Sequence, residues 1–302
     1  MKQIIRITIG LTISCLIAAL LMGVVFTITA KAKKHNEHVQ VQETMLDLLG
    51  YNGANPAPPD LKLHNIYRYI LKDGRKKYLG YMIPVKEAGS LGYKLLIITL
   101  DGKFHELIDL SISPEKAIEA QERETALNEA LQPPVTFTYA DETAVAVTEG
   151  KRLAYLVRGE FQGFKTFITI MLAFDPNFRI LGMEVMEHEE DPGLGGEIEE
   201  DYFEDQFKNK TFEKIKKLDV VKKPLPEEYR KYLEPKLRRT LTGEDLAKIR
   251  KMYQDADIYA LTGATISSKA VTDGVKNATK KFAYRIEVLD SVIAEHRVAA
   301  AF

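Results

Sequence analysis

The sequence predicts an α+β protein in which one membrane-spanning helix precedes a folded domain of antiparallel strands and helices. Three observations lead to this prediction: an uncharged apolar stretch near the N-terminus, a central region in which turn residues alternate with β-branched and aromatic runs, and helical periodicity near the C-terminus. The formal net charge is −1, with 42 Lys+Arg against 43 Asp+Glu, so the composition gives no electrostatic reason to expect nucleic-acid binding. Local motifs must therefore indicate the function.

The apolar stretch runs from Ile7 to Ala30, and as a helix it would rise about 36 Å. This length is enough to cross a hydrocarbon core of about 30 Å. The alternative is a cleaved signal peptide, because small residues at positions 30 and 32 offer a cleavage pattern. Secretory apolar regions are only about 7–15 residues long, so we expect a retained anchor over residues 1–34 and a linker over 35–60. The flanking basic residues slightly favour a cytoplasmic C-terminal domain.

Two segments of the folded part are similar and predict a duplicated half-unit. In each, a Gly-aromatic-Lys triplet is followed by an apolar run and an Asp-led turn. The triplets are residues 92–94 and 163–165, and the turns begin at Asp101 and Asp175. Such alternation is typical of antiparallel strands joined by hairpins.

Helices are expected in three further places. Ser113 as N-cap and Pro114 in the first helical position predict a helix that extends to Leu131. A charged stretch interrupted by prolines predicts a solvated helical insertion at residues 219–251. Apolar residues with a helical period predict a long helix from Ser267 onward.

The strongest chemical signal precedes that last helix. The chain reads Thr262-Gly263-Ala264-Thr265, followed by Ser267-Ser268. Gly263 and Ala264 leave little side-chain bulk beside the Thr265 hydroxyl, and Ser267 or Ser268 is expected to cap the helix, whose free N–H groups favour an anion. This tetrad resembles the flavinylation motif of the family that comprises RnfG, from the Rnf electron transport complex, and NqrC, from the sodium-translocating NADH:quinone reductase. The resemblance implies FMN linked through a phosphoester to Thr265.

A second match lies upstream, in the loop that begins at His188. It is similar to the His-x-Glu-Thr-Pro-Gly-Leu-Gly loop of the same family, with Asp191 in the place usually held by Thr. Glycines in this loop would let the backbone approach a planar ring closely. His188 could shuttle protons, although a lone His beside a turn is more often a hydrogen-bonding surface group. The expected cofactor-binding residues are Thr262, Gly263, Ala264, Thr265, Ser267, Ser268, His188, Glu190, Pro192, Gly193, Leu194 and Gly195.

The resemblance extends from about Val145 to Ala283 and implies one covalent FMN. It implies an FMN-binding domain over residues 141–290, followed by a tail at 291–302. The half-unit without flavin motif at 61–140 is inferred from the repeat. This half-unit and the insertion at 219–251 exceed a minimal member of the family, which leaves the specific complex open. The first copy shows no such tetrad, and the sequence shows no Cys-His cluster that would bind a metal.

The same family implies a location and partners. It places the protein in the cytoplasmic membrane as a single-pass protein with its C-terminal domain on the outer, periplasmic side, against the charge count. The implied partners are other membrane subunits of an Rnf/Nqr-type complex, which couples ferredoxin or NADH chemistry to ion movement, and a flavin transferase for maturation. The chain would be an electron carrier without catalytic residues of its own. Two alternatives are a flavoprotein donor domain of another membrane reductase and a flavin-free tethered binding module.

Overall fold

The computed structural model describes residues 2–87 and 89–302 and divides the chain into two compact units, residues 1–47 and 48–302. Helix α1 (Lys2–Leu48) forms the first unit. Its stretch from Gln3 to Thr29 is long and apolar enough to cross a membrane, and the side chains of this stretch are exposed. This finding agrees with the apolar membrane-spanning stretch predicted from Ile7 to Ala30. The same helix also continues into the region 35–60, where we expected a linker.

The second unit contains one eight-stranded antiparallel sheet with the strand order β4-β3-β2-β1-β5-β6-β7-β8. The strands are β1 (Lys62–Asp73), β2 (Lys76–Glu87), β3 (Ser90–Thr99), β4 (Phe104–Leu110), β5 (Thr136–Thr148), β6 (Lys151–Gln162), β7 (Phe167–Phe174) and β8 (Ile180–Glu187). Two four-stranded meanders meet where β1 pairs with β5. The turns that begin at Asp101 and Asp175 join β3 to β4 and β7 to β8. The α+β class with an antiparallel sheet is thus confirmed.

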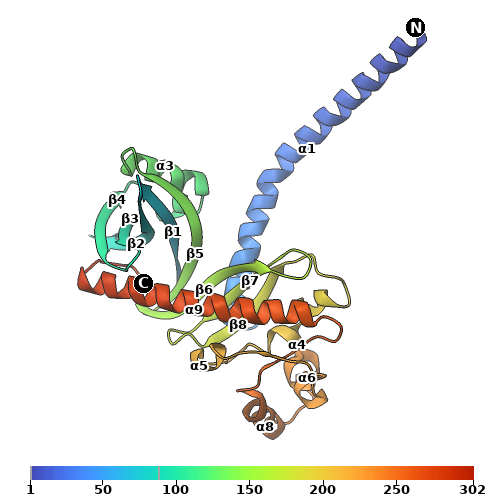
Figure 1. Ribbon diagram of the computed structural model, residues 1–302, viewed down its shortest axis with the longest axis vertical. Coiled ribbons are helices and arrows are strands. Elements are labelled where there is room, and N and C mark those ends of the chain that lie inside the picture. Colours follow the sequence, from blue (N-terminus) through green and yellow to red (C-terminus); the bar gives the residue numbers. More distant parts are fainter. Residues whose placement is uncertain (1, 88) are drawn as a thin grey trace. The chain divides into compact units, whose positions relative to one another are not determined.

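Helices cover both faces of the first meander. Helices α2 (Pro114–Ala117) and α3 (Ala120–Ala130) bury one face, and the long helix α9 (Thr265–Glu295) crosses the other face and continues over β6 and β7 (Figure 1). Successive residues of β3 therefore belong to different cores: Leu95 packs towards α3, and Leu96 packs towards α9. This two-sided burial explains why β3 is a continuous apolar run rather than an alternating pattern.

The helix predicted from Ser113 to Leu131 begins as expected but is divided in two. The Ser113 hydroxyl accepts a hydrogen bond from the Lys116 amide at 3.5 Å, and Pro114 occupies the first turn. The division follows from buried Arg123, whose guanidinium donates to the carbonyls of Ala117 and Ile118 at 2.7 and 2.8 Å. These carbonyls lie at the C-terminal end of α2. The Arg123 guanidinium therefore supplies the hydrogen-bond donors that the next helical turn would otherwise provide.

Short elements connect β8 to α9. They are η1 (Gly195–Glu199), α4 (Asp201–Glu204), α5 (Phe212–Ile215), β9 (Val220–Val221), α6 (Glu227–Leu233), α7 (Pro235–Arg238), α8 (Gly243–Tyr253) and β10 (Ile258–Tyr259). The insertion that we expected to be solvated has charged outer faces but also a small core of its own, formed by Tyr229, Leu233, Ile249 and Tyr253. The rings of Tyr229 and Tyr253 stack with centroids 4.1 Å apart. Tyr259 of β10 packs against this core.

The C-terminal residues extend the sheet. Helix α9 ends at Glu295, inside the region that we expected as a tail. The Lys86 amide then donates to the Ala299 carbonyl, and the Ala301 amide donates to the Pro84 carbonyl, both at 2.9 Å. The last residues are therefore held against β2.

Candidate functional site

Helix α9 begins at Thr265, two residues earlier than predicted. Its N-cap is Ala264, which provides no side-chain cap, so the expectation that Ser267 or Ser268 caps the helix is wrong. Both serines lie inside the first turns and are buried. Ser268 Oγ instead accepts from the Leu261 amide at 3.0 Å and donates to the Ala264 carbonyl at 2.9 Å. Ser268 therefore fastens the preceding turn to the helix.

Thr265 has a half-buried side chain, and its hydroxyl makes no hydrogen bond to any residue that the structure describes. Within the same described part of the chain, the backbone amides of Thr265, Ile266 and Ser267 also have no acceptor. Three unpaired N–H groups at a helix N-terminus attract a phosphate, and the helix dipole adds to this attraction. Lys269 lies one turn further along, and its ammonium forms ion pairs with Asp219 at 3.5 Å and with Asp273 at 3.2 Å.

Gly263 shapes the turn that precedes α9. Its φ of +79° lies in the left-handed region, which favours glycine. A Cβ at this position would lie 3.0 Å from Leu194 Cδ2, so the loop that contains Leu194 contacts the Thr-Gly-Ala-Thr turn. The two motifs that lie about 70 residues apart in the sequence are thus brought together.

Glu190 connects three segments of the site. Its side chain is buried, and Oε1 accepts from the amides of Phe164 and Lys165 at 2.7 and 3.1 Å. The other oxygen, Oε2, accepts from the Ser267 hydroxyl at 2.5 Å. One carboxylate therefore links the β6–β7 turn, the loop at 188–196 and the first turn of α9.

His188 supports this loop through both ring nitrogens. Nδ1 accepts a hydrogen bond from the Glu190 amide at 3.1 Å, and Nε2 lies 3.1 Å from Glu199 Oε2. If Nδ1 accepts, the ring proton is on Nε2 and faces the carboxylate. Both ring nitrogens are thus engaged in holding the loop.

The loop has an exposed tip and a buried base. Pro192, Gly193 and Leu194 are exposed, whereas Gly195 and Gly196 are buried. A Cβ on Gly195 would lie 2.7 Å from Ser267 Oγ and 2.8 Å from Glu190 Oε2, whereas a Cβ on Gly193 would meet no atom within 4 Å. Gly195 is therefore required for the contact between Glu190 and α9. Gly193 is required for its backbone conformation, because its φ is +72°.

The sequence prediction did not include the β6–β7 turn in the site. Gly163 lies so close to Glu190 that an added Cβ would be 2.5 Å from Oε1. Lys165 forms an ion pair with Asp191, the residue that stands in place of the usual Thr. The triplet 163–165 had been noted only as part of the repeat, and nothing local in it indicates a contact with residue 190.

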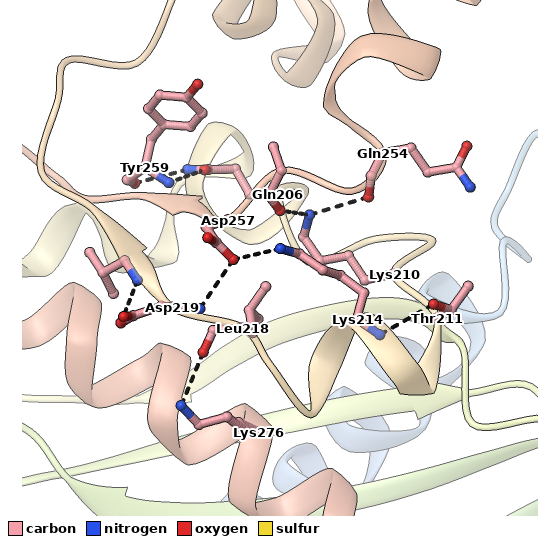
Figure 2. Close-up of polar contacts among 12 residues, drawn as sticks. Gln206, Lys210, Thr211, Lys214, Leu218, Asp219, Gln254, Asp257, Tyr259 and Lys276 are labelled. Carbon is pink, nitrogen blue, oxygen red and sulfur yellow. Dashed lines mark hydrogen bonds and ion pairs between the residues drawn. The ribbon is translucent and has the colours of Figure 1, made fainter.

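A polar cluster before the tetrad was also absent from the predicted site (Figure 2). In this cluster, side chains from residues 206–214 form hydrogen bonds and an ion pair with residues 254–259. Residues 254–259 are the segment that leads into the Thr262–Thr265 turn. One signal in the sequence is that polar residues are interleaved with the apolar positions Phe207, Phe212 and Ile215.

Glu204, the last residue of α4, has a pKa that is shifted by burial. Desolvation raises the pKa of Glu204 to about 9, and a hydrogen bond from the Val185 amide at 2.6 Å opposes this shift. Glu204 therefore retains its proton at neutral pH while it holds α4 against β8.

Comparison with known protein families matches residues 163–280 to the family described as FMN-binding domain. The match starts at the β6–β7 turn and includes the loop at 188–196, the polar cluster and the tetrad. The chain is also 33% identical over 131 residues to the G subunit of the proton-translocating ferredoxin:NAD(+) oxidoreductase complex of Clostridium ljungdahlii. That alignment covers 43% of this chain and 54% of the relative, so the chain spans about half the length of the relative that it matches.

Two solved structures are distant likenesses. Shewanella oneidensis NqrC is 20% identical with a TM-score of 0.34, and 48% of this chain is covered against 57% of that chain. The C subunit of the sodium-translocating NADH-quinone reductase of Parabacteroides distasonis is 18% identical with a TM-score of 0.33, with coverage of 64% and 74%. From the family match, we conclude that the chain carries an FMN-binding domain over residues 163–280.

Proposed function

We propose that this chain is a membrane-anchored electron carrier of an Rnf-type ferredoxin/NAD oxidoreductase complex and that it carries FMN as a phosphoester of Thr265. The observation that carries the proposal is the Thr265 hydroxyl, which has no partner among the described residues and lies beside three unpaired amides inside the matched domain. The electron-transfer role is supported by the sequence relative, which is the G subunit of such a complex.

The residues of this site fit FMN. The amides of α9 can bind the phosphate, and Thr265 Oγ can become its ester oxygen. Three exposed apolar side chains, Phe164, Leu194 and Ile266, lie on the three segments that Glu190 connects. They provide apolar surface for the flavin ring, which supplies the redox chemistry when bound.

Attachment requires a transferase and an activated flavin dinucleotide as donor. A bond forms between Thr265 Oγ and the FMN phosphorus, while the bond from that phosphorus to the leaving nucleoside monophosphate breaks. The hydroxyl proton passes to a base of the transferase. The chain contributes an accessible hydroxyl and amides that stabilise the phosphate charge.

Intact-mass spectrometry of the denatured full-length chain tests the proposal. We expect one FMN ester per chain when the host contains a flavin transferase, and a washed, denatured chain that stays yellow. An unmodified mass from such a host contradicts the covalent linkage and favours the flavin-free binding module. A chain that carries FMN but copurifies with a different reductase favours the donor-domain alternative.

The side of the membrane forms part of the proposal. We place the domain on the outer face of the cytoplasmic membrane, where the transferases of this family act, although the flanking charges favour the opposite orientation. Protease added to intact spheroplasts should cleave the domain. Full protection of the domain, with cleavage after the membrane is permeabilised, places it in the cytoplasm instead.

Two glycines of the loop should differ in their effect on the flavin. Gly195→Val places a side chain against Ser267 and Glu190, so it should lower the free energy of unfolding by roughly 2–4 kcal/mol and change the flavin spectrum or midpoint potential. The covalent flavin should remain in the mass spectrum. Gly193→Ala has open space and should cost only about 1 kcal/mol of backbone strain. Equal flavin signals in both variants would remove Gly195 from the site.

A further inference from the structure

Gln206 forms two hydrogen bonds with the backbone of Tyr259 (Figure 2). Its side chain is 2% exposed. Oε1 accepts from the Tyr259 amide at 2.7 Å, and Nε2 donates to the Tyr259 carbonyl at 3.2 Å. The side-chain amide of Gln206 thus pairs with the backbone of Tyr259 as a neighbouring strand would, and it fixes the orientation of Tyr259. Tyr259 lies only six positions before Thr265.

Lys210 holds the segment just before this point. It is 2% exposed, and its Nζ donates to the Ala256 carbonyl at 2.6 Å and reaches the Gln254 carbonyl at 3.5 Å. These carbonyls follow the C-terminus of α8, where acceptors lack helical partners and a positive charge is favoured. No carboxylate of the described residues forms an ion pair with Lys210.

Retaining a lysine at this position has an electrostatic cost. Desolvation, with a smaller effect from Lys214, lowers the pKa of Lys210 to about 8, while Asp257 and Asp255 act in the opposite direction. The charged form is therefore disfavoured by burial. The Lys210 side chain is costly to bury and donates only to backbone carbonyls. We therefore infer that its role is to hold the segment that carries these carbonyls.

Further contacts connect residues 254–259 with helix α9. Lys214 Nζ forms an ion pair with Asp257 Oδ1 at 2.6 Å, and β10 pairs with β9 through residues 220–221 and 258–259. Lys276 of α9 donates to the Leu218 carbonyl at 3.0 Å. Contacts therefore run without a break from the end of α8, through residues 206–221, to the helix that starts at Thr265.

We propose that Gln206 and Lys210 are positioning residues for the flavin acceptor: they fix residues 254–259 and thereby the place at which Thr265 is presented to the transferase and to the flavin phosphate. The inference rests on the proposed function of Thr265. Neither residue contacts Thr265, so both act through the connecting segment. The residue after Tyr259 is bonded to β9, because the Ala260 amide donates to the Val221 carbonyl at 3.0 Å. The next residue is bonded to α9, because the Leu261 amide donates to Ser268 Oγ at 3.0 Å. The position of Tyr259 is therefore connected to the start of α9 through two consecutive residues.

The same positioning couples the helical insertion to the site. Tyr259 is held by Gln206 and packs on the core of the insertion, and its ring lies 6.1 Å from that of Tyr229 and 6.3 Å from that of Tyr253. Lys210 bonds the end of α8, the last helix of the insertion. The insertion thus serves as a support for the acceptor segment.

The test uses full-length Gln206→Leu and Lys210→Met chains produced without transferase. Lys208→Met is the control, because it is the same substitution on the same segment at a side chain that is 48% exposed. Each folded chain is then incubated with transferase and flavin dinucleotide, and FMN attachment is followed by intact mass. We expect attachment to be slowed by roughly 10- to 100-fold per folded chain in both variants, because small misplacements of a reacting group have effects of this size. The control should react at the wild-type rate.

Hydrogen exchange gives a readout that does not depend on flavin. In the unmodified chains, amides of residues 258–264 should lose protection in both variants and keep it in Lys208→Met. If Gln206→Leu does not fold, Lys210→Met provides the same two measurements, and Gln206→Glu, which keeps the acceptor for the Tyr259 amide, should be intermediate. A wild-type attachment rate together with unchanged protection overturns the inference, even if the melting temperature falls.

Failure of the proposed function is distinguishable from failure of the inference. If the wild-type chain accepts no FMN, the assignment of Thr265 as acceptor is wrong. The exchange measurement then decides on its own whether Gln206 and Lys210 fix this segment. If the wild type is modified and the variants react equally fast, the positioning role is wrong and the function stands.

Discussion

The Thr265→Ala variant is expected to fold like the wild type and to carry no covalent FMN. The substitution removes the only oxygen that can form the ester at this position. It should cost little stability, because the hydroxyl has no partner among the described residues and alanine is a better helix former than threonine by about 0.5 kcal/mol. Intact mass after denaturation measures the flavin, and a thermal melt of the full chain in detergent measures the stability. Thr265→Ser should be partly modified, since the hydroxyl remains.

Thr262→Ala is the matched control for this substitution. Thr262 is the other threonine of the tetrad and is exposed. Its variant should keep the ester, because the phosphate is expected at the N-terminus of α9 and not at the start of the turn. Retention of covalent FMN in Thr265→Ala, or its loss only in Thr262→Ala, would assign the ester to another hydroxyl.

Glu190→Leu should destabilise the fold as strongly as Gly195→Val. Removal of the carboxylate leaves the partly buried amides of Phe164 and Lys165 and the buried Ser267 hydroxyl without their acceptor. The expected loss is roughly 2–4 kcal/mol in the free energy of unfolding, because unsatisfied buried donors cost about 1–3 kcal/mol each and the structure relaxes in part. Denaturant unfolding of the full chain in detergent measures it.

The neighbouring Glu189→Leu variant provides the control. Glu189 is exposed, so its substitution should change the stability by no more than about 0.5 kcal/mol. Glu190→Gln keeps an acceptor for the two amides and should lie between the two leucine variants. If Glu190→Leu and Glu189→Leu unfold at the same denaturant concentration, Glu190 does not hold the three segments together.

Much of the fold follows from local patterns. The long apolar helix, the hairpins at Asp101 and Asp175 and the N-cap at Ser113 depend on neighbouring residues, and each is present in the structure. The break between α2 and α3 could not be predicted, because Arg123 reaches back to carbonyls that would otherwise bond within a continuous helix. The start of α9 was misplaced because serines favour an N-cap position in isolation, whereas here both are used for contacts inside the fold.

The site was predictable as two motifs but not as an arrangement. The tetrad at 262–265 and the glycine-containing loop at 188–196 were identified by their resemblance to a family. A helix N-terminus near Thr265 could be predicted from residue types within a few positions of one another. The contacts that join Glu190 to Ser267 across 77 positions, and Gln206 to Tyr259 across 53, became visible only in the folded chain. Such pairs depend on the register of the sheet and on the path of the chain over it, and local propensities carry no information about either.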